Sequence, residues 1–171
     1  MTSQTNRTGA LAMIAALAMT TVTGCGLMKS DADKVSNPLT PEQSEDQVID
    51  AAHETVATLG LQVTNASVWH ASCNDQGDPP FRGQLRLSYP PPAAGAGNPI
   101  DQIVQKLKAQ GWTDAQDFAT HGTALEKNNI VAVFAPGNAI NANYSIEFFG
   151  ECRDITTTKD TKGRVEPITL T

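Results

Sequence analysis

The stretch FRGQLRLSY, residues 81–89, alternates cleanly between apolar and polar side chains. One side of the alternation carries Phe81, Leu85, Leu87 and Tyr89, and the other carries Arg82, Gln84, Arg86 and Ser88. Because successive side chains of a strand point to opposite faces, this pattern predicts an antiparallel strand with one face buried and the other in water. The rest of the chain must therefore cover one face of a sheet.

The first segment able to cover that face runs from Thr40 to Gly60. Thr40 is suited to cap a helix, Pro41 to occupy its first position, and Gln43 to complete a capping box. Apolar residues then recur three or four positions apart, at Val48, Ala51, Ala52, Val56 and Leu59. This spacing predicts an amphipathic helix that ends at Gly60.

A second helix is predicted after Asn98, which can cap it, with Gly111 as its stop. Its inward-facing residues are Ile100, Ile103, Val104 and Leu107. We expect Trp112, just beyond the stop, to pack over the helix end.

Further strands are predicted over 62–73, 123–127, 130–134 and 141–150, and Asn128-Asn129 is a hairpin signal between the second and third of these. The order of elements is helix, two strands, helix, three strands. This order favours an α+β fold in which two helices pack on one face of an antiparallel sheet of about five strands, a two-layer sandwich.

The N-terminus has the features of an export signal. Residues 1–9 carry one arginine and no acid, and 10–22 are apolar apart from two threonines. Thirteen residues are too few for a comfortable transmembrane helix, which needs about 20, but they suit the apolar core of a signal peptide. The run ends in Val22-Thr23-Gly24-Cys25, which resembles a bacterial lipobox. We therefore expect residues 1–24 to be a lipoprotein signal peptide and Cys25 to carry the lipid.

Four segments follow from this assignment: the signal over 1–24, the lipidated cysteine and a flexible tether over 25–39, a single α+β domain over 40–155, and a polar tail over 156–171. The tail is rich in threonine, so we expect it either to be disordered or to end in a short edge strand.

With Cys25 assigned to lipid, Cys73 and Cys152 are the two remaining thiols of an exported domain. Disulfides form and persist outside the cytosol, so we predict a bridge between them. The alternative is a pair of free buried thiols. The bridge would pin an early strand to the last one.

Composition excludes some classes of function. The chain has 18 acidic and 12 basic residues and a formal net charge of −6. Nucleic-acid binding needs a clustered basic surface, so we expect no nucleic-acid partner. The three histidines, His53, His70 and His121, show no spacing typical of a metalloprotease, and the chain has no nucleophile-elbow or phosphate-loop motif. We therefore predict no cofactor and no enzymatic activity.

The best candidate for a functional loop is CNDQGDPP, residues 73–80. Asn74, Asp75 and Asp78 offer oxygen ligands, and the predicted disulfide would bring Arg153 near them. Calcium needs six to eight oxygens, more than this loop supplies. The simpler interpretation is a turn in which an aspartate pairs with an arginine, and the alternatives are a cation site or a catalytic carboxylate pair.

The segment SCNDQGDPPFRG, residues 72–83, resembles small mycobacterial lipoproteins of the LppJ type. The lipobox, the Gly-Trp at 111–112 and GECRD at 150–154 add to this resemblance, which runs from about 40 to 155. It implies an envelope lipoprotein and carries no catalytic residues across.

Together these features predict a lipoprotein anchored through Cys25 at the outer face of the cell membrane. We expect its domain to be a non-catalytic module that binds a lipid, a glycan or an envelope protein. A lipid site would be a cavity between helices and sheet, lined by Val48, Leu59, Leu87, Ile103, Leu107, Tyr144 and Phe148. The alternative is an envelope hydrolase or cation-binding protein that uses the 73–80 loop together with His70.

Overall fold

The computed structural model describes residues 30–91 and 98–170, so the predicted signal peptide and Cys25 lie outside the described residues. Its helical elements are η1 (Ala32–Lys34), α1 (Pro41–Leu59) and α2 (Pro99–Lys108). Its strands are β1 (Asn65–Ser72), β2 (Phe81–Tyr89), β3 (Thr113–Asp114), β4 (Thr123–Lys127), β5 (Ile130–Ala135), β6 (Tyr144–Phe149) and β7 (Glu166–Pro167).

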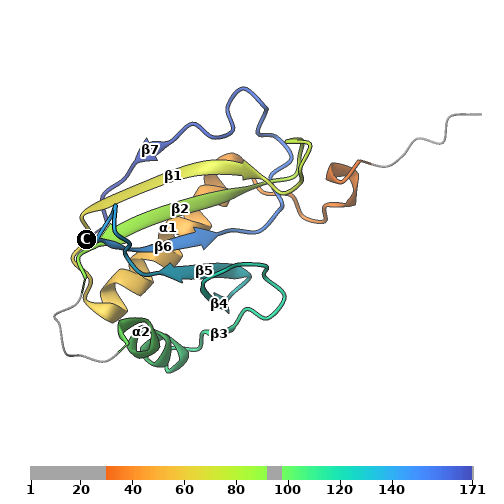
Figure 1. The fold of residues 1–171 in the computed structure, drawn as a ribbon. Helices are drawn as coiled ribbons and strands as arrows, with labels where there is room; N and C mark the ends of the chain where they lie inside the picture. The colour runs from red at the N-terminus through yellow and green to blue at the C-terminus, as the bar shows by residue number, and fades with distance from the viewer. Residues whose placement is uncertain (1–29, 92–97, 171) are drawn as a thin grey trace, which may run out of the picture.

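One sheet runs through the described part of the chain, in the order β3-β4-β5-β6-β2-β1-β7, and every neighbouring pair is antiparallel. Helix α1 crosses one face of this sheet, and α2 lies beside the C-terminal end of α1 (Figure 1). The α+β sandwich predicted from the sequence is confirmed. The sheet has seven strands rather than about five because β3 and β7, of two residues each, are too short to show a sequence period.

Local sequence explains both helix starts. The Thr40 hydroxyl accepts a hydrogen bond from the Gln43 backbone while the Gln43 side chain accepts one from the Thr40 backbone, so the predicted capping box is formed. Asn98 caps α2 through the Ile100 N–H. Such caps satisfy N–H groups that have no partner within the helix.

The core lies between the helices and the sheet. The helix side of β2 is fully buried at Leu85 and Leu87, as the alternation predicted. Trp112 is also buried there, beyond the end of α2. The opposite face of the sheet carries no helix among the described residues (Figure 1). On the polar side of β2, Arg86 is exposed, whereas Arg82, Gln84 and Ser88 are half-buried.

The C-terminal segment is part of the fold. Strand β7 pairs with β1, and Leu170 is buried in the core. The folded unit therefore extends beyond residue 155, where we expected the domain to end. Of the two expectations for the tail, the short edge strand is the one that the structure shows, since β7 is the last strand of the sheet. The polar composition hid the extent of the packing because only Leu170 and Thr157 in the segment are buried.

Candidate functional site

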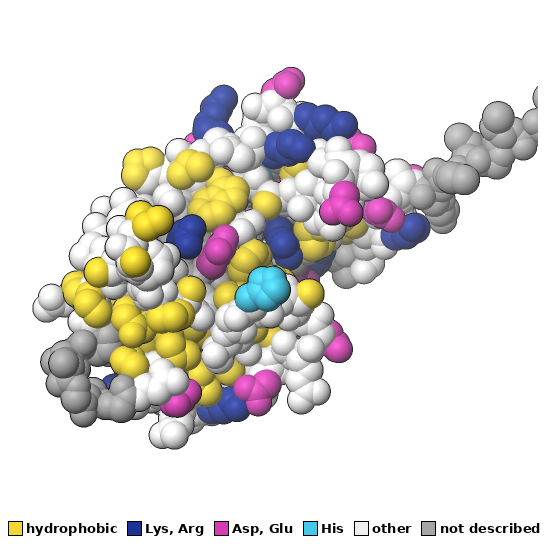
Figure 2. All heavy atoms as spheres, in the orientation of Figure 1, with side chains coloured by type: hydrophobic (Ala, Val, Ile, Leu, Met, Phe, Trp, Pro, Cys, Tyr) yellow, Lys and Arg dark blue, Asp and Glu magenta, His cyan; other side chains and the backbone are white. Residues whose placement is uncertain are grey.

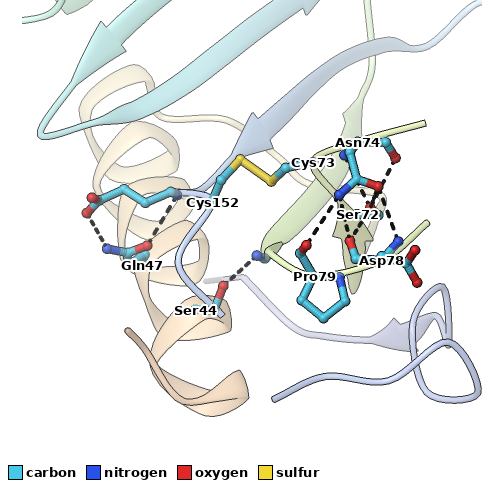
Figure 3. Close-up of a disulfide and its surroundings, with 10 residues drawn as sticks. Ser44, Gln47, Ser72, Cys73, Asn74, Asp78, Pro79 and Cys152 are labelled. Carbon is cyan, nitrogen blue, oxygen red and sulfur yellow. Dashed lines mark hydrogen bonds between the residues drawn. A yellow bond between two sulfur atoms is a disulfide. The ribbon is translucent and has the colours of Figure 1, made fainter. Parts of the chain in front are cut away.

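The 73–80 loop is a hydrogen-bonded turn. The Asn74 side chain donates to the carbonyl oxygens of Asp78 (3.0 Å) and Pro79 (3.3 Å) and accepts from the Asp78 N–H (3.2 Å) (Figure 3). The Asp78 carboxylate pairs with Lys159 at 2.8 Å, and Asp75 is exposed. The carboxamide of Asn74 is thus already used inside the turn, as the simpler interpretation of this loop expected. The ion pair of that interpretation was assigned to the wrong partner, because Asp78 pairs with a lysine, Lys159, and not with an arginine.

The disulfide between Cys73 and Cys152 is formed, and it joins the end of β1 to the segment after β6 (Figure 3). Arg153 does not reach the aspartates of the loop. Its guanidinium pairs with Glu151 at 3.1 Å and donates to the Asn37 carbonyl at 2.8 Å. Arg153 therefore fixes the chain that leads back to Cys25, and the four residues expected to form a binding loop do not converge.

No group of three or more His, Cys, Asp or Glu side chains in the described residues is arranged to hold a metal ion. The other alternative for the loop, a catalytic carboxylate pair working with His70, would need His70 to lie beside the loop aspartates. His70 lies on the helix side of β1 and faces Glu45 and Asp154 rather than Asp75 or Asp78.

Both ring nitrogens of His70 face acceptors. Its Nε2 lies 3.1 Å from the Pro41 carbonyl oxygen and 3.9 Å from the Asp154 carboxylate, and its Nδ1 lies 3.4 Å from Glu45. A carbonyl oxygen can only accept, so Nε2 donates there. Burial raises the pKa of Glu45, and the nearby His70 opposes this shift.

Asp154 is completely buried. Burial by itself would raise the pKa of its carboxyl, but hydrogen bonds from Thr157 and Thr156 outweigh burial, and the net pKa lies below the ordinary value. The carboxylate accepts from both backbone N–H groups and both hydroxyls of these threonines. The sequence placed Asp154 in the resemblance motif but did not reveal this role, which needs the chain after β6 to turn back on itself.

Beside His70 a polar cleft of about 480 Å³ opens between the start of α1 and the C-terminal segment. Its wall includes Glu42, Glu45, Arg164 and Glu166 together with four threonines. Acidic and hydroxyl groups dominate this wall.

A second hollow, of about 290 Å³, lies at the other end of the molecule between the C-terminal end of α1 and α2. Its apolar wall is formed by Leu59, Leu61, Tyr89, Pro90, Pro99 and Ile103. Lys106, Gln62 and Gln102 also line it. We refer to this hollow as the α1–α2 groove.

The groove corresponds only in part to the cavity expected from the sequence. Leu59 and Ile103 line it, whereas four of the other expected residues pack in the hydrophobic core: Val48, Leu87, Leu107 and Phe148. Tyr144 packs against the core, with its ring 5.9 Å from that of Tyr89. The apolar hollow thus lies at the end of α1, whereas we expected it at the centre of the sandwich.

Tyr89 contributes an unusual group to this region. Its hydroxyl is buried and has no hydrogen-bond partner among the described residues. Burial, with a contribution from Tyr144, raises the pKa of Tyr89 to about 12. The hydroxyl therefore remains a hydrogen-bond donor at all physiological pH values, and leaving it unpaired is unfavourable.

The family model and the curated relatives that match this chain carry the same description. A family model described as "Putative lipoprotein LppJ" matches residues 40–171. Two curated relatives with the same description, from Mycobacterium tuberculosis (strain CDC 1551 / Oshkosh) and Mycobacterium bovis (strain ATCC BAA-935 / AF2122/97), are each 32% identical over 160 residues. Each match covers 85% of this chain and 82% of the relative. No solved structure is similar.

Proposed function

The chain belongs to the LppJ family of lipoproteins, and we infer that it is held by lipid on Cys25 at the outer face of the cell membrane, where its domain binds an amphiphilic ligand without catalysis. The family membership confirms the resemblance noted in the sequence. No helix among residues 30–91 and 98–170 has both the length and the apolar character needed to cross a bilayer.

The lipobox at 22–25 supports the anchor. Two or more acyl chains hold a protein firmly on a membrane, whereas one chain holds it only marginally. Arg153 donates a hydrogen bond to the Asn37 carbonyl, which attaches the chain to the domain at this residue. The dozen residues between Cys25 and this point can span at most about 40 Å. The domain therefore stays close to the membrane surface.

Replacing Cys25 by alanine tests the anchor. We expect Cys25→Ala to lose incorporation of labelled palmitate and to leave the membrane fraction or accumulate as an uncleaved precursor. The matched control is the double variant Cys73→Ala/Cys152→Ala, which removes the other two thiols and keeps the label. Palmitate that remains on Cys25→Ala would overturn the anchor assignment.

The observation that carries the binding proposal is the α1–α2 groove. It is open, its wall is mostly apolar, and exposed Lys106 lines it. Apolar hollows with a few convergent polar groups are the usual form of small-ligand sites. A ligand with one apolar chain and an acidic headgroup suits this combination.

The position of the groove is consistent with this role. The tether enters near the start of α1, and the groove lies at the far end of that helix (Figure 1). Helix α1 has 19 residues and is therefore about 28 Å long. The groove is thus presented away from the end of the domain that the tether holds.

The geometry at His70 favours binding over catalysis. A general base needs a free nitrogen that can reach a substrate proton. Both His70 nitrogens already face acceptors, and the oxygens of Asp154 are occupied by threonine donors. This engagement is typical of a structural cluster.

Binding of a fluorescent fatty acid by the full chain in detergent tests the groove. We expect saturable binding that Leu61→Asp abolishes and that Lys106→Gln weakens several-fold. The control Lys108→Gln makes the same charge change on the same helix, but Lys108 pairs with Asp114 rather than lining the groove. Equal effects of the two lysine variants, or no saturable binding, would contradict the proposal.

A further inference from the structure

A small polar hollow of about 190 Å³ lies on the helix-free face of the sheet, where β2, β5 and β6 meet the loop that joins β5 to β6. Its polar wall consists of Arg86, Ser88, Ser145, Asn138, Asn141 and Asn143. None of the described residues lining it carries a carboxylate, although acidic residues outnumber basic ones in the chain. Arg86 is the only charged side chain among the described residues that line this hollow.

The loop engages the side-chain oxygens of two of its asparagines, Asn138 and Asn141. The Asn138 side-chain oxygen accepts from the backbone N–H groups of Ile140 and Asn141, both at 2.9 Å. The Asn141 side-chain oxygen accepts from the Asn143 N–H at 3.0 Å. Since each carboxamide has one oxygen and one NH₂ group, the NH₂ donors of Asn138 and Asn141 are the atoms left for a ligand.

The loop is held closed by a near approach of its two ends. Asn138 donates its N–H to the Asn141 carbonyl at 2.7 Å, and a Cβ on Gly137 would lie 2.1 Å from the Ala142 carbonyl oxygen. Glycine is therefore required at position 137. The side chains of the hollow are presented by a defined turn.

Arg86 supplies the charge. It is exposed, and it has no ion pair with any described residue. Its register partner on β6 is Glu147, but that carboxylate accepts a hydrogen bond from Gln84. Figure 2, which views this face, shows a few basic and acidic side chains set among uncharged ones. The guanidinium donors of Arg86 therefore have no partner among the described residues, while the Glu147 carboxylate is the acidic group opposite Arg86 in the register.

We propose that this hollow binds a phosphate group. A guanidinium, two hydroxyls and two carboxamide NH₂ groups present donors from three segments of the chain, which suits an anion with several oxygens. The hollow lies at the end of β2 away from the tether, so the phosphate belongs to a soluble or polymer-borne molecule rather than to the anchoring bilayer. No residue of the α1–α2 groove takes part, so this site stands apart from the proposed function.

Calorimetric titration of the full chain in maltoside micelles tests the site, with inorganic phosphate and glycerol 3-phosphate as probes. We expect saturable binding of both, weakened about tenfold in Arg86→Gln, as for the loss of a charged hydrogen-bond donor. The matched control is Arg164→Gln, which removes the same charge from an exposed residue of the cleft beside His70 and leaves binding unchanged. Circular dichroism verifies that both variants fold.

Equal weakening by the two arginine variants would overturn the proposal, because it would show an effect of net charge alone. Absence of saturable binding by the wild-type chain would also overturn it. A phosphate signal displaced by phosphatidylglycerol micelles but not by glycerol 3-phosphate would overturn the assignment to a soluble or polymer-borne source. Displacement by glycerol 3-phosphate supports that assignment.

Discussion

At the scale of single residues, Asp154 connects the two ends of the described chain. Its backbone exchanges hydrogen bonds with Phe81 at 2.6 and 3.1 Å, and its side chain organises Thr156 and Thr157. The preceding carbonyl, of Arg153, accepts from the Leu39 N–H at 2.9 Å. One short segment thus joins the start of the domain, the start of β2 and the C-terminal segment.

We predict that Asp154→Asn destabilises the domain by roughly 2–4 kcal/mol at pH 7, because an amide leaves buried donors without acceptors. The folded pKa of Asp154 lies below its ordinary value, so its stabilisation is present above the ordinary pKa of aspartate and is lost as pH falls through the folded pKa. The difference between wild type and variant should therefore shrink below about pH 4. Urea unfolding at several pH values measures it.

The control for this prediction is Asp75→Asn, at an exposed residue of the 73–80 loop. Its effect should stay within about 0.5 kcal/mol, as is usual for surface positions. A destabilisation by Asp154→Asn that did not change between pH 7 and pH 3 would contradict the role given to the ionised carboxylate.

Leu170 is the second residue whose role the structure reveals. It is buried in the core although it belongs to the polar C-terminal segment, and its neighbour Thr169 is exposed. Leu170→Asp should destabilise the domain by about 3 kcal/mol or more, because it buries a charge without a partner. Thr169→Asp should change stability by less than about 0.5 kcal/mol. Similar unfolding midpoints for the two variants would show that this segment is not part of the folded unit.

At the scale of elements, α1 lies unusually close to β2. The Ser44 hydroxyl accepts a hydrogen bond from the Gly83 N–H at 2.7 Å, and a Cβ on Gly83 would lie 2.1 Å from the Ser44 carbonyl oxygen. Ser44 is itself completely buried. Gly83 therefore interrupts the apolar side of β2 in order to admit the helix backbone.

Gly83→Ala should destabilise the domain by about 3 kcal/mol or more, since the helix must move away from the strand. Ser44→Ala should have a smaller effect, about 1–3 kcal/mol, because it removes only the acceptor of a buried N–H. Chemical denaturation of the two variants gives both values. An effect of Gly83→Ala no larger than that of Ser44→Ala would contradict the close approach.

Most elements were predictable because their signals are local. A capping box, an N-terminal proline and an apolar stripe locate α1, and strict alternation locates β2. The Asn128-Asn129 turn was also predicted, and both residues have positive φ, as a tight hairpin turn needs. The two-residue strands β3 and β7 have no such signal, since they exist only because neighbouring strands pair with them.

At the scale of the whole molecule, the disulfide ties the end of β1 to the segment that follows β6, across 79 positions of sequence. The same segment continues into Asp154 and the C-terminal chain. Cross-linking positions this far apart restricts the unfolded chain strongly.

Removal of the bridge in the double variant Cys73→Ser/Cys152→Ser should lower the free energy of unfolding by about 2–5 kcal/mol. Urea unfolding compares this variant with the oxidised wild type. The wild type after reduction is the matched control and should reach the same stability. A reduced wild type as stable as the oxidised form would show that the bridge does not restrict the unfolded chain.

The sequence by itself determined the fold class, the cap and face of α1, the disulfide partners and the family, because each depends on a local period, a short motif or the count of thiols. The tertiary structure alone decided which side chains meet. It turned the 73–80 loop into a closed turn, placed Glu45 and Asp154 around His70, and moved the apolar hollow to the end of α1. These contacts join residues far apart in the chain, and their geometry depends on helix placement and strand register, which no local pattern specifies.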